Sequence, residues 1–118
     1  MVEITAGSFE EAKRIARTLV EERLAACVNL LRGLGSIYRW KGRVEEAEET
    51  LLLAKTTEAA LPALSDRVRA LHSYACPCIA AWPIEGGNPD YLAWIEAECV
   101  GPGARQHGSH AAPGGGGD

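Results

Sequence analysis

The sequence has no long apolar stretch and no excess of positive charge, and each absence excludes a class of protein. Its longest apolar runs, such as residues 51–54, fall far short of the ~20 residues that cross a bilayer. With 16 acidic and 12 basic residues, the net charge of −4 provides no attraction to nucleic acid or anionic lipid. We therefore expect neither a nucleic-acid-binding protein nor a membrane protein.

Common enzyme motifs are also missing. The chain contains no GxSxG, HExxH, P-loop or dinucleotide-binding glycine pattern. A nucleophilic thiol at Cys76 or Cys78, assisted by His72, stays open as an alternative, although no third group that would orient the histidine is indicated. We predict that the protein is not an enzyme.

The cysteines and the N-terminus indicate the compartment. Cys27, Cys76, Cys78 and Cys99 form no CxxC pair, and the first residues carry acids where a signal peptide would carry a basic segment. Both features are typical of a cytoplasmic protein with free thiols. We predict a cytoplasmic location.

One strand and three helices follow from local signals. Ser8 and Glu11 form a capping-box pattern after a β-prone segment, so we expect a strand over 2–6 and then a helix. The helix carries one apolar stripe, and a second helix is expected over 61–71 with Pro62 in its first turn. Whether Thr56 or Thr57 caps that helix or ends the preceding strand is left open. Asn88 and Pro89 predict a short final helix with Tyr91, Trp94 and Ile95 on its apolar side. The apolar stripe of the first helix is formed by Ala12, Ile15, Ala16, Leu19 and Val20.

The middle of the chain predicts a long hairpin. A strand over 27–31, interrupted by Gly33 and Gly35, resumes over 36–40, and Lys41-Gly42 marks the turn. The return arm covers 43–55, and a last strand is expected over 78–84, with Pro83 at an edge, a bulge or the strand end.

This order predicts an α+β, ferredoxin-like fold: β-α-β-β-α-β plus a C-terminal helix, with an antiparallel sheet and the helices on one face. We assign residues 1–100 to this domain and 101–118, which are rich in glycine, to a flexible tail. Two short helices cannot cover all of Tyr38, Trp40 and Trp82, so we predict a homo-oligomer.

A metal site is one interpretation of residues 72–78. His72, Cys76 and Cys78 offer the imidazole and thiolate ligands that a soft or borderline cation prefers. The alternative is structural: cysteine packs well as a small buried hydrophobe, and His72 at a helix end can hydrogen-bond carbonyl groups. The acidic run 45–49 has a similar pair of interpretations, a hard-cation site or a solvated hairpin edge.

Five blocks of this sequence together resemble one family, the CutA divalent-cation tolerance proteins. The blocks cover about Ile4 to Glu98 and read VEERLAACVNLL (20–31), GSIYRWKGRVEEAEE (35–49), LLLAKTT (51–57), LHSY (71–74) and NPDYLAWI (88–95). The resemblance implies a trimer built by edge-to-edge strand contacts and a role in tolerance to copper and other divalent cations. It brings no enzymatic activity.

The resemblance also implies site residues. Tyr38, Trp40, Lys55, Tyr74, Tyr91 and Trp94 match recurrent family positions, as does His72, and several are expected around an intersubunit cleft that could bind a small molecule. Lys55 would attract an anion there. The family is similar in architecture to the PII signalling trimers, so an effector-binding regulatory trimer is the alternative function. The chain departs from the family where two carboxylates are replaced by Ala75 and Cys78, which weakens the case for a metal site that depends on those acids.

Overall fold

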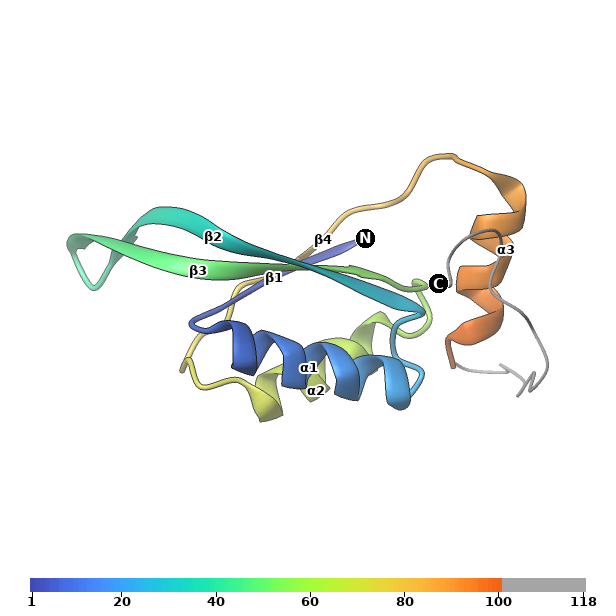
Figure 1. Cartoon of the computed structure of the whole chain (residues 1–118), viewed down its shortest axis with the longest axis horizontal. Helices are drawn as coiled ribbons and strands as arrows, with labels where there is room; N and C mark the ends of the chain where they lie inside the picture. The colour runs from blue at the N-terminus through green and yellow to red at the C-terminus, as the bar shows by residue number, and fades with distance from the viewer. Residues whose placement is uncertain (101–118) are drawn as a thin grey trace.

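The computed structural model describes residues 1–100, which form an antiparallel sheet covered by helices on one face (Figure 1). The strand order is β2-β3-β1-β4, and every neighbouring pair is antiparallel. The strands are β1 (Val2–Ala6), β2 (Cys27–Trp40), β3 (Arg43–Lys55) and β4 (Ile79–Ala81). The predicted α+β, ferredoxin-like class is confirmed, whereas the predicted tail 101–118 lies outside the described residues.

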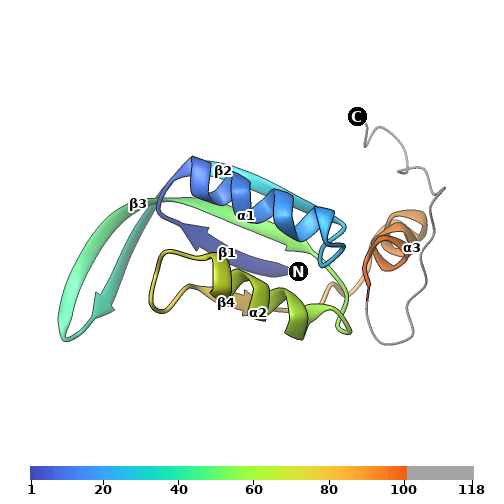
Figure 2. The same cartoon turned by 90° about the horizontal axis from the view of Figure 1, so that it is seen from below.

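Helices α1 (Phe9–Glu21) and α2 (Leu61–Leu71) lie side by side across the same face of the sheet, as Figure 2 shows. We call this the covered face and the opposite one the open face. Alternating side chains of β1 and β3 point to the covered face and meet the apolar stripes of both helices. The fully buried side chains at this contact are Val2, Ile4, Ile15, Leu19, Leu52, Leu64 and Val68.

Helix α1 begins as its sequence predicts. The Ser8 hydroxyl accepts a hydrogen bond from the Glu11 backbone N–H at 3.1 Å, so Ser8 is the N-cap. The carboxylate of Glu11, however, does not return to Ser8 to complete a capping box. The predicted apolar stripe also needs a correction, because Val20, which was assigned to it, is 41% exposed.

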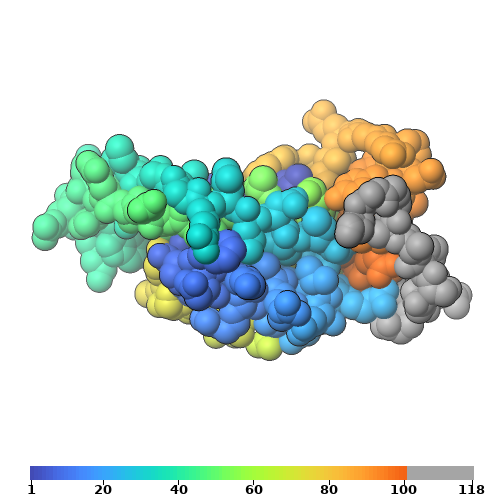
Figure 3. All heavy atoms as spheres, in the orientation of Figure 1, coloured from blue at the N-terminus to red at the C-terminus, as the bar shows by residue number. Residues whose placement is uncertain are grey.

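Strands β2 and β3 form a hairpin that extends well beyond the helices (Figure 3). β2 is continuous, which corrects the predicted interruption at Gly33 and Gly35. Instead it contains a β-bulge: Leu31 pairs with Leu51 and Leu34 with Glu49, so β2 carries one extra residue between them. Gly33 occupies the bulge with a φ of 76°, a conformation that favours glycine.

The hairpin turn has positive φ at both central positions, 51° at Lys41 and 81° at Gly42. This is the type I′ geometry whose twist matches that of the flanking strands. The predicted turn is therefore confirmed, as are the bounds of the return arm.

β4 is shorter than the predicted 78–84. The strand ends at Ala81. The pairing with the N-terminal strand continues for one more residue, because Met1 and Trp82 exchange two backbone hydrogen bonds, each 3.0 Å from nitrogen to oxygen. In an antiparallel pair the next residue's N–H would point away from β1, so Pro83, which has no N–H, leaves no bond of the ladder unmade at this edge of the sheet.

Helix α3 (Pro89–Glu98) lies at the end of the sheet away from the hairpin tip (Figure 1). Asn88 caps it through its side chain, as predicted. Ile95 and Cys99 pack with Ala26 and Ala60 in a second small core. None of the helices among the described residues is long and apolar enough to cross a membrane.

Candidate functional site

The segment that follows α2 carries His72, the first predicted metal ligand. Its backbone N–H ends the helix by donating to the Val68 carbonyl, and its ring is buried. Nε2 lies 2.7 Å from the Thr5 carbonyl oxygen, and Nδ1 lies 3.1 Å from the Tyr74 backbone nitrogen. Because Nδ1 accepts from an N–H, Nε2 must carry the proton that it donates to Thr5. Both ring nitrogens are therefore occupied.

Glu11 holds the same segment to α1. Its Oε2 accepts from the Ser73 backbone N–H at 2.8 Å and its Oε1 from the Ser73 hydroxyl at 3.1 Å. Oε2 is also 3.6 Å from His72 Nδ1. Burial alone would raise the pKa of Glu11, but the bonds from Ser73 and the nearby His72 lower it overall. The carboxylate thus stays ionised and anchors the turn after α2.

Tyr74 crosses to the open face, where its hydroxyl donates to Glu49 Oε2 at 2.8 Å. Burial and this bond raise the pKa of Tyr74 to about 12. A Cβ at Gly7 would lie 3.2 Å from the Tyr74 hydroxyl, so glycine at this position lets the ring approach the backbone closely. Tyr74 is engaged in the fold, and its hydroxyl is not directed toward open solvent.

Cys76 and Cys78 are exposed and free. Within residues 1–100, no group of three histidine, cysteine or acidic side chains could hold a metal ion, so His72, Cys76 and Cys78 do not form one. The predicted three-ligand metal site is therefore not formed within residues 1–100 of a single chain. A metal-binding role for the two exposed thiols stays a prediction.

Lys55, Tyr91 and Trp94 lie near one another at the α3 end of the open face. Lys55 pairs with Cys27 across β2 and β3, and its ammonium group donates to Asn29 Oδ1. The rings of Tyr91 and Trp94 are 5.5 Å apart, centre to centre. Burial and the Cys27 thiol beside it raise the pKa of Tyr91. We call Cys27, Asn29, Lys55 and Tyr91 the Lys55 cluster.

Tyr38 and Trp40 lie on the hairpin, away from that cluster. Both are 44% exposed, and Lys41 places its ammonium group 5.9 Å from the centre of the Trp40 ring. The six residues predicted to bind a small molecule are therefore divided in one chain, with Lys55, Tyr91 and Trp94 at one end of the sheet. Tyr38, Trp40 and Tyr74 belong to the other end.

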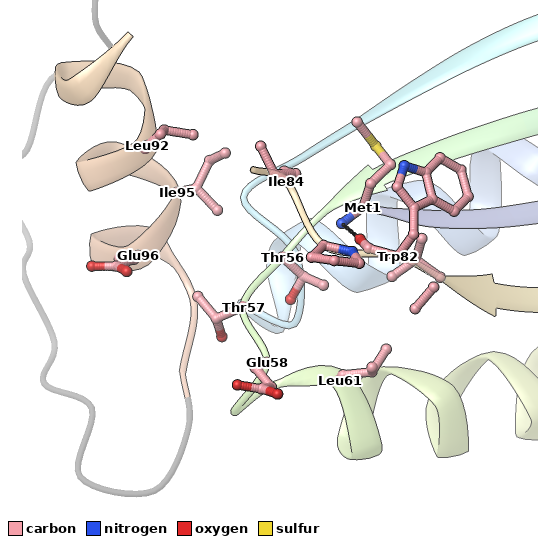
Figure 4. A pocket seen from close by; sticks show the side chains of 13 residues that line it. Met1, Thr56, Thr57, Glu58, Leu61, Trp82, Ile84, Leu92, Ile95 and Glu96 are labelled. Atoms are coloured by element: carbon pink, nitrogen blue, oxygen red, sulfur yellow. Dashed lines mark hydrogen bonds between the residues drawn. The ribbon is translucent and has the colours of Figure 1, made fainter. Parts of the chain in front are cut away.

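A hollow of about 500 Å³ lies between α3, the end of β4 and the segment before α2 (Figure 4). Its lining is mainly apolar, and two carboxylates, Glu58 and Glu96, belong to it. Leu92 and Ile95 line it from α3, and Trp82 and Ile84 from the chain after β4. Sequence reasoning missed this hollow, because its residues are dispersed over the whole domain.

Asn29, Glu11 and Glu49 were also missed as site residues. Asn29 had a signal: it is the one polar residue in the apolar run 27–31. In the structure its side-chain oxygen accepts hydrogen bonds from Lys55 and Cys27. Glu49 stands at the end of an acidic run and had no signal that separated it from its neighbours.

The sequence and the fold have clear counterparts among known proteins. Residues 1–98 match the family model described as CutA1 divalent ion tolerance protein. The divalent-cation tolerance protein CutA of Thermus thermophilus is 58% identical over 95 residues, which cover 80% of this chain and 92% of that protein. The human protein CutA is 48% identical over 92 residues, and the match spans only 51% of its length.

Solved structures agree with the sequence matches. The structure of the Thermus thermophilus protein has a TM-score of 0.83 at 56% identity and covers 84% of this chain and 96% of that one. A structure described as the periplasmic divalent cation tolerance protein CutA of Archaeoglobus fulgidus has a TM-score of 0.79 at 44% identity. It covers 82% of this chain and 94% of that one.

Proposed function

The chain belongs to the CutA1 divalent ion tolerance family, and we propose that it acts in cation tolerance by binding divalent or soft cations, copper among them, as a homotrimer without catalysis. The observation that carries this proposal is the pair of exposed thiols, Cys76 and Cys78, beside an edge strand. A cytoplasmic location remains our prediction.

The hairpin supports an assembly of several copies. Ile37 and Val44 are 72% and 63% exposed, and Tyr38 and Trp40 add aromatic surface. Apolar surface of this extent on a protruding element is typical of an interface. Because β2 and β4 are the two edges of the sheet, pairing of one copy's β2 with the next copy's β4 is a head-to-tail contact. Such a contact closes into a ring when the rotation between copies is a third of a turn.

The hairpin tip and the hollow beside α3 are also complementary. The tip combines Trp40 with the cations of Lys41 and Arg43, whereas the hollow is apolar and contains Glu58 and Glu96. An aromatic anchor flanked by positive charge suits such a hollow. We expect that the tip of one copy enters the hollow of the next.

Native mass measurement tests this assembly. Wild type is expected as a trimer at micromolar concentration, and Trp40→Ala and Lys41→Glu should shift the equilibrium toward monomer. Lys13→Glu, on an exposed part of α1, makes the same charge change as a control. A wild-type monomer would contradict the proposal.

The two thiols are the cation ligands that the structure leaves accessible. Burial and the nearby Glu3 raise the pKa of Cys78, so a cation must displace its proton, and affinity should increase with pH. Two thiols are an incomplete coordination sphere, which further copies in a trimer would complete. His72 has no free ring nitrogen to contribute.

Titration with Zn(II) and Cu(I) tests the thiol site. Cys76→Ser with Cys78→Ser should abolish tight binding, whereas Cys99→Ser, at a buried thiol, should preserve it. His72→Gln should lower stability and leave the number of bound ions unchanged. If the double variant binds as tightly as wild type, the thiols are not the ligands.

The alternative, a regulatory trimer that binds a small effector, is favoured by one observation. Lys55, Tyr91 and Trp94, three of the predicted small-molecule residues, lie at one end of the open face. A charged donor beside aromatic rings is a common arrangement in small-molecule sites.

A further inference from the structure

The Lys55 cluster has a charge that the fold does not neutralise. Lys55 is half-buried and directly follows the apolar run 51–54, and among residues 1–100 no carboxylate lies within 4.0 Å of its ammonium group. Its hydrogen bond to the Asn29 side-chain oxygen solvates the charge but does not cancel it. A lysine in this position usually pairs with an acid or extends into water.

The strand register positions the cluster. Lys55 is opposite Cys27, and Asn29 is two residues further along β2, so all three side chains point to the open face. Tyr91 of α3 comes next to Cys27, and a hydrogen bond to that thiol contributes to the raised pKa of the Tyr91 hydroxyl. Three elements of the fold therefore converge on this one place.

The hydrogen bonds also fix which atoms remain for a ligand. Asn29 Oδ1 accepts from Lys55 and lies 3.9 Å from Cys27 Sγ, so its amide nitrogen, with two N–H groups, faces away from both. Asn29 is exposed, which leaves those donors accessible. Lys55 has further N–H groups, whereas the one O–H of Tyr91 is used in its bond to the Cys27 thiol. The cluster thus presents donors and one positive charge.

We infer that the Lys55 cluster is a binding site for a small oxyanion, a carboxylate or phosphate group, held by the ammonium of Lys55 and the amide of Asn29, with Tyr91 beside it. This inference rests on the proposed effector-binding function and gives its chemistry. Charge-assisted bonds to an oxyanion are among the strongest that these donors make. The adjacent Trp94 ring provides an apolar wall for the rest of a ligand.

The test is a chemical-shift titration of the full chain with inorganic phosphate and, separately, with succinate, each against sodium chloride at equal ionic strength. Wild type should show saturable shifts at residues 27–29, 55 and 91 with one or both anions. Lys55→Met keeps the apolar stem and should weaken binding at least tenfold, whereas Lys13→Met, at an exposed position of α1, should not. Asn29→Asp should abolish binding, because it replaces the donors with a carboxylate that pairs with Lys55.

The results distinguish which anion is recognised and whether the site or the effector function is wrong. Binding of phosphate alone or succinate alone identifies the group that is recognised, and no saturable shift beyond that of chloride overturns the site. Equal binding by wild type and Lys55→Met, with both shown to be folded by circular dichroism, overturns it as well. If Lys55→Met instead lowers the oligomer mass and neither anion binds, Lys55 meets a carboxylate of a second copy and the site is refuted. If the anions bind but no larger effector does, the effector function fails and the site stands.

Discussion

Replacing Glu11 by glutamine measures how strongly the turn after α2 is held to α1. Glu11 is only 7% exposed, and its carboxylate accepts two hydrogen bonds from Ser73, at 2.8 and 3.1 Å. Bonds to a charged acceptor contribute ~1.5–3 kcal/mol, and neutral ones ~0.5–1.5 kcal/mol. Glutamine keeps the shape and one acceptor oxygen, so we expect the free energy of unfolding to fall by about 1–2 kcal/mol at pH 7.

The pH dependence gives a second, independent readout. The pKa of Glu11 is lowered in the folded protein, because the bonds from Ser73 outweigh the effect of burial. A carboxyl group with a lowered folded pKa contributes its stability above the unfolded value, about 4.3, and loses it as the pH falls through the folded pKa. The difference between wild type and Glu11→Gln should therefore be constant near neutral pH and shrink below about pH 4.

Urea unfolding at one fixed protein concentration, repeated from pH 7 to pH 3, measures both effects. Glu10→Gln is the matched control, since Glu10 is exposed in the same helical turn and shares its interaction with the helix dipole. We expect the control to change stability by less than about 0.5 kcal/mol. Equal losses in the two variants, or a Glu11 difference that persists unchanged at pH 3, would refute the anchoring role.

Three further substitutions test other parts of the fold. Tyr74→Phe should cost about 1.5–2 kcal/mol by removing the bond to Glu49, and absorbance titration should lose the tyrosine that ionises near pH 12 in wild type. Gly42→Ala should cost about 1 kcal/mol, because φ is 81° there, whereas Gly35→Ala meets no atom within 4 Å and should be nearly neutral in the same thermal unfolding assay. Leu64→Ala should cost about 2–5 kcal/mol in urea, and a loss below 1 kcal/mol would show that this contact between α2 and the sheet is not tightly packed.

Element bounds were predictable where the sequence has strong local signals. Lys41-Gly42 fixes the hairpin turn, and Pro62 and Asn88-Pro89 fix helix starts, so β3 and α2 have the predicted bounds. The bulge was not predictable, because Leu31 and Leu34 belong to a segment with no regular alternation of buried and exposed residues. The short β4 reflects its limited pairing with β1, which a strand propensity does not reveal.

The site residues were predictable by position but not by role. His72 and Tyr74 were recognised as interesting, yet their partners are far away in the chain: Thr5 is 67 residues from His72, and Glu49 is 25 residues from Tyr74. Such partners satisfy the ring nitrogens and the hydroxyl, and only the tertiary structure brings them together. Lys55 shows the same limit, since only the tertiary structure reveals that no acid within residues 1–100 pairs with its ammonium group.

The bulge between Leu31 and Leu34 determines which side chains the far half of the hairpin displays on each side. Because strand residues alternate between faces, one extra residue inverts the parity of all that follow. Tyr38 and Trp40 consequently share the face of Leu51 and Lys55, whereas Ile37 and Arg39 turn to the other. A single-residue deletion at Gly33 would exchange these two sets along the arm. The number of residues in the bulge is thus constrained separately from their identity, because a change in that number alters the surface that the hairpin offers to a neighbour.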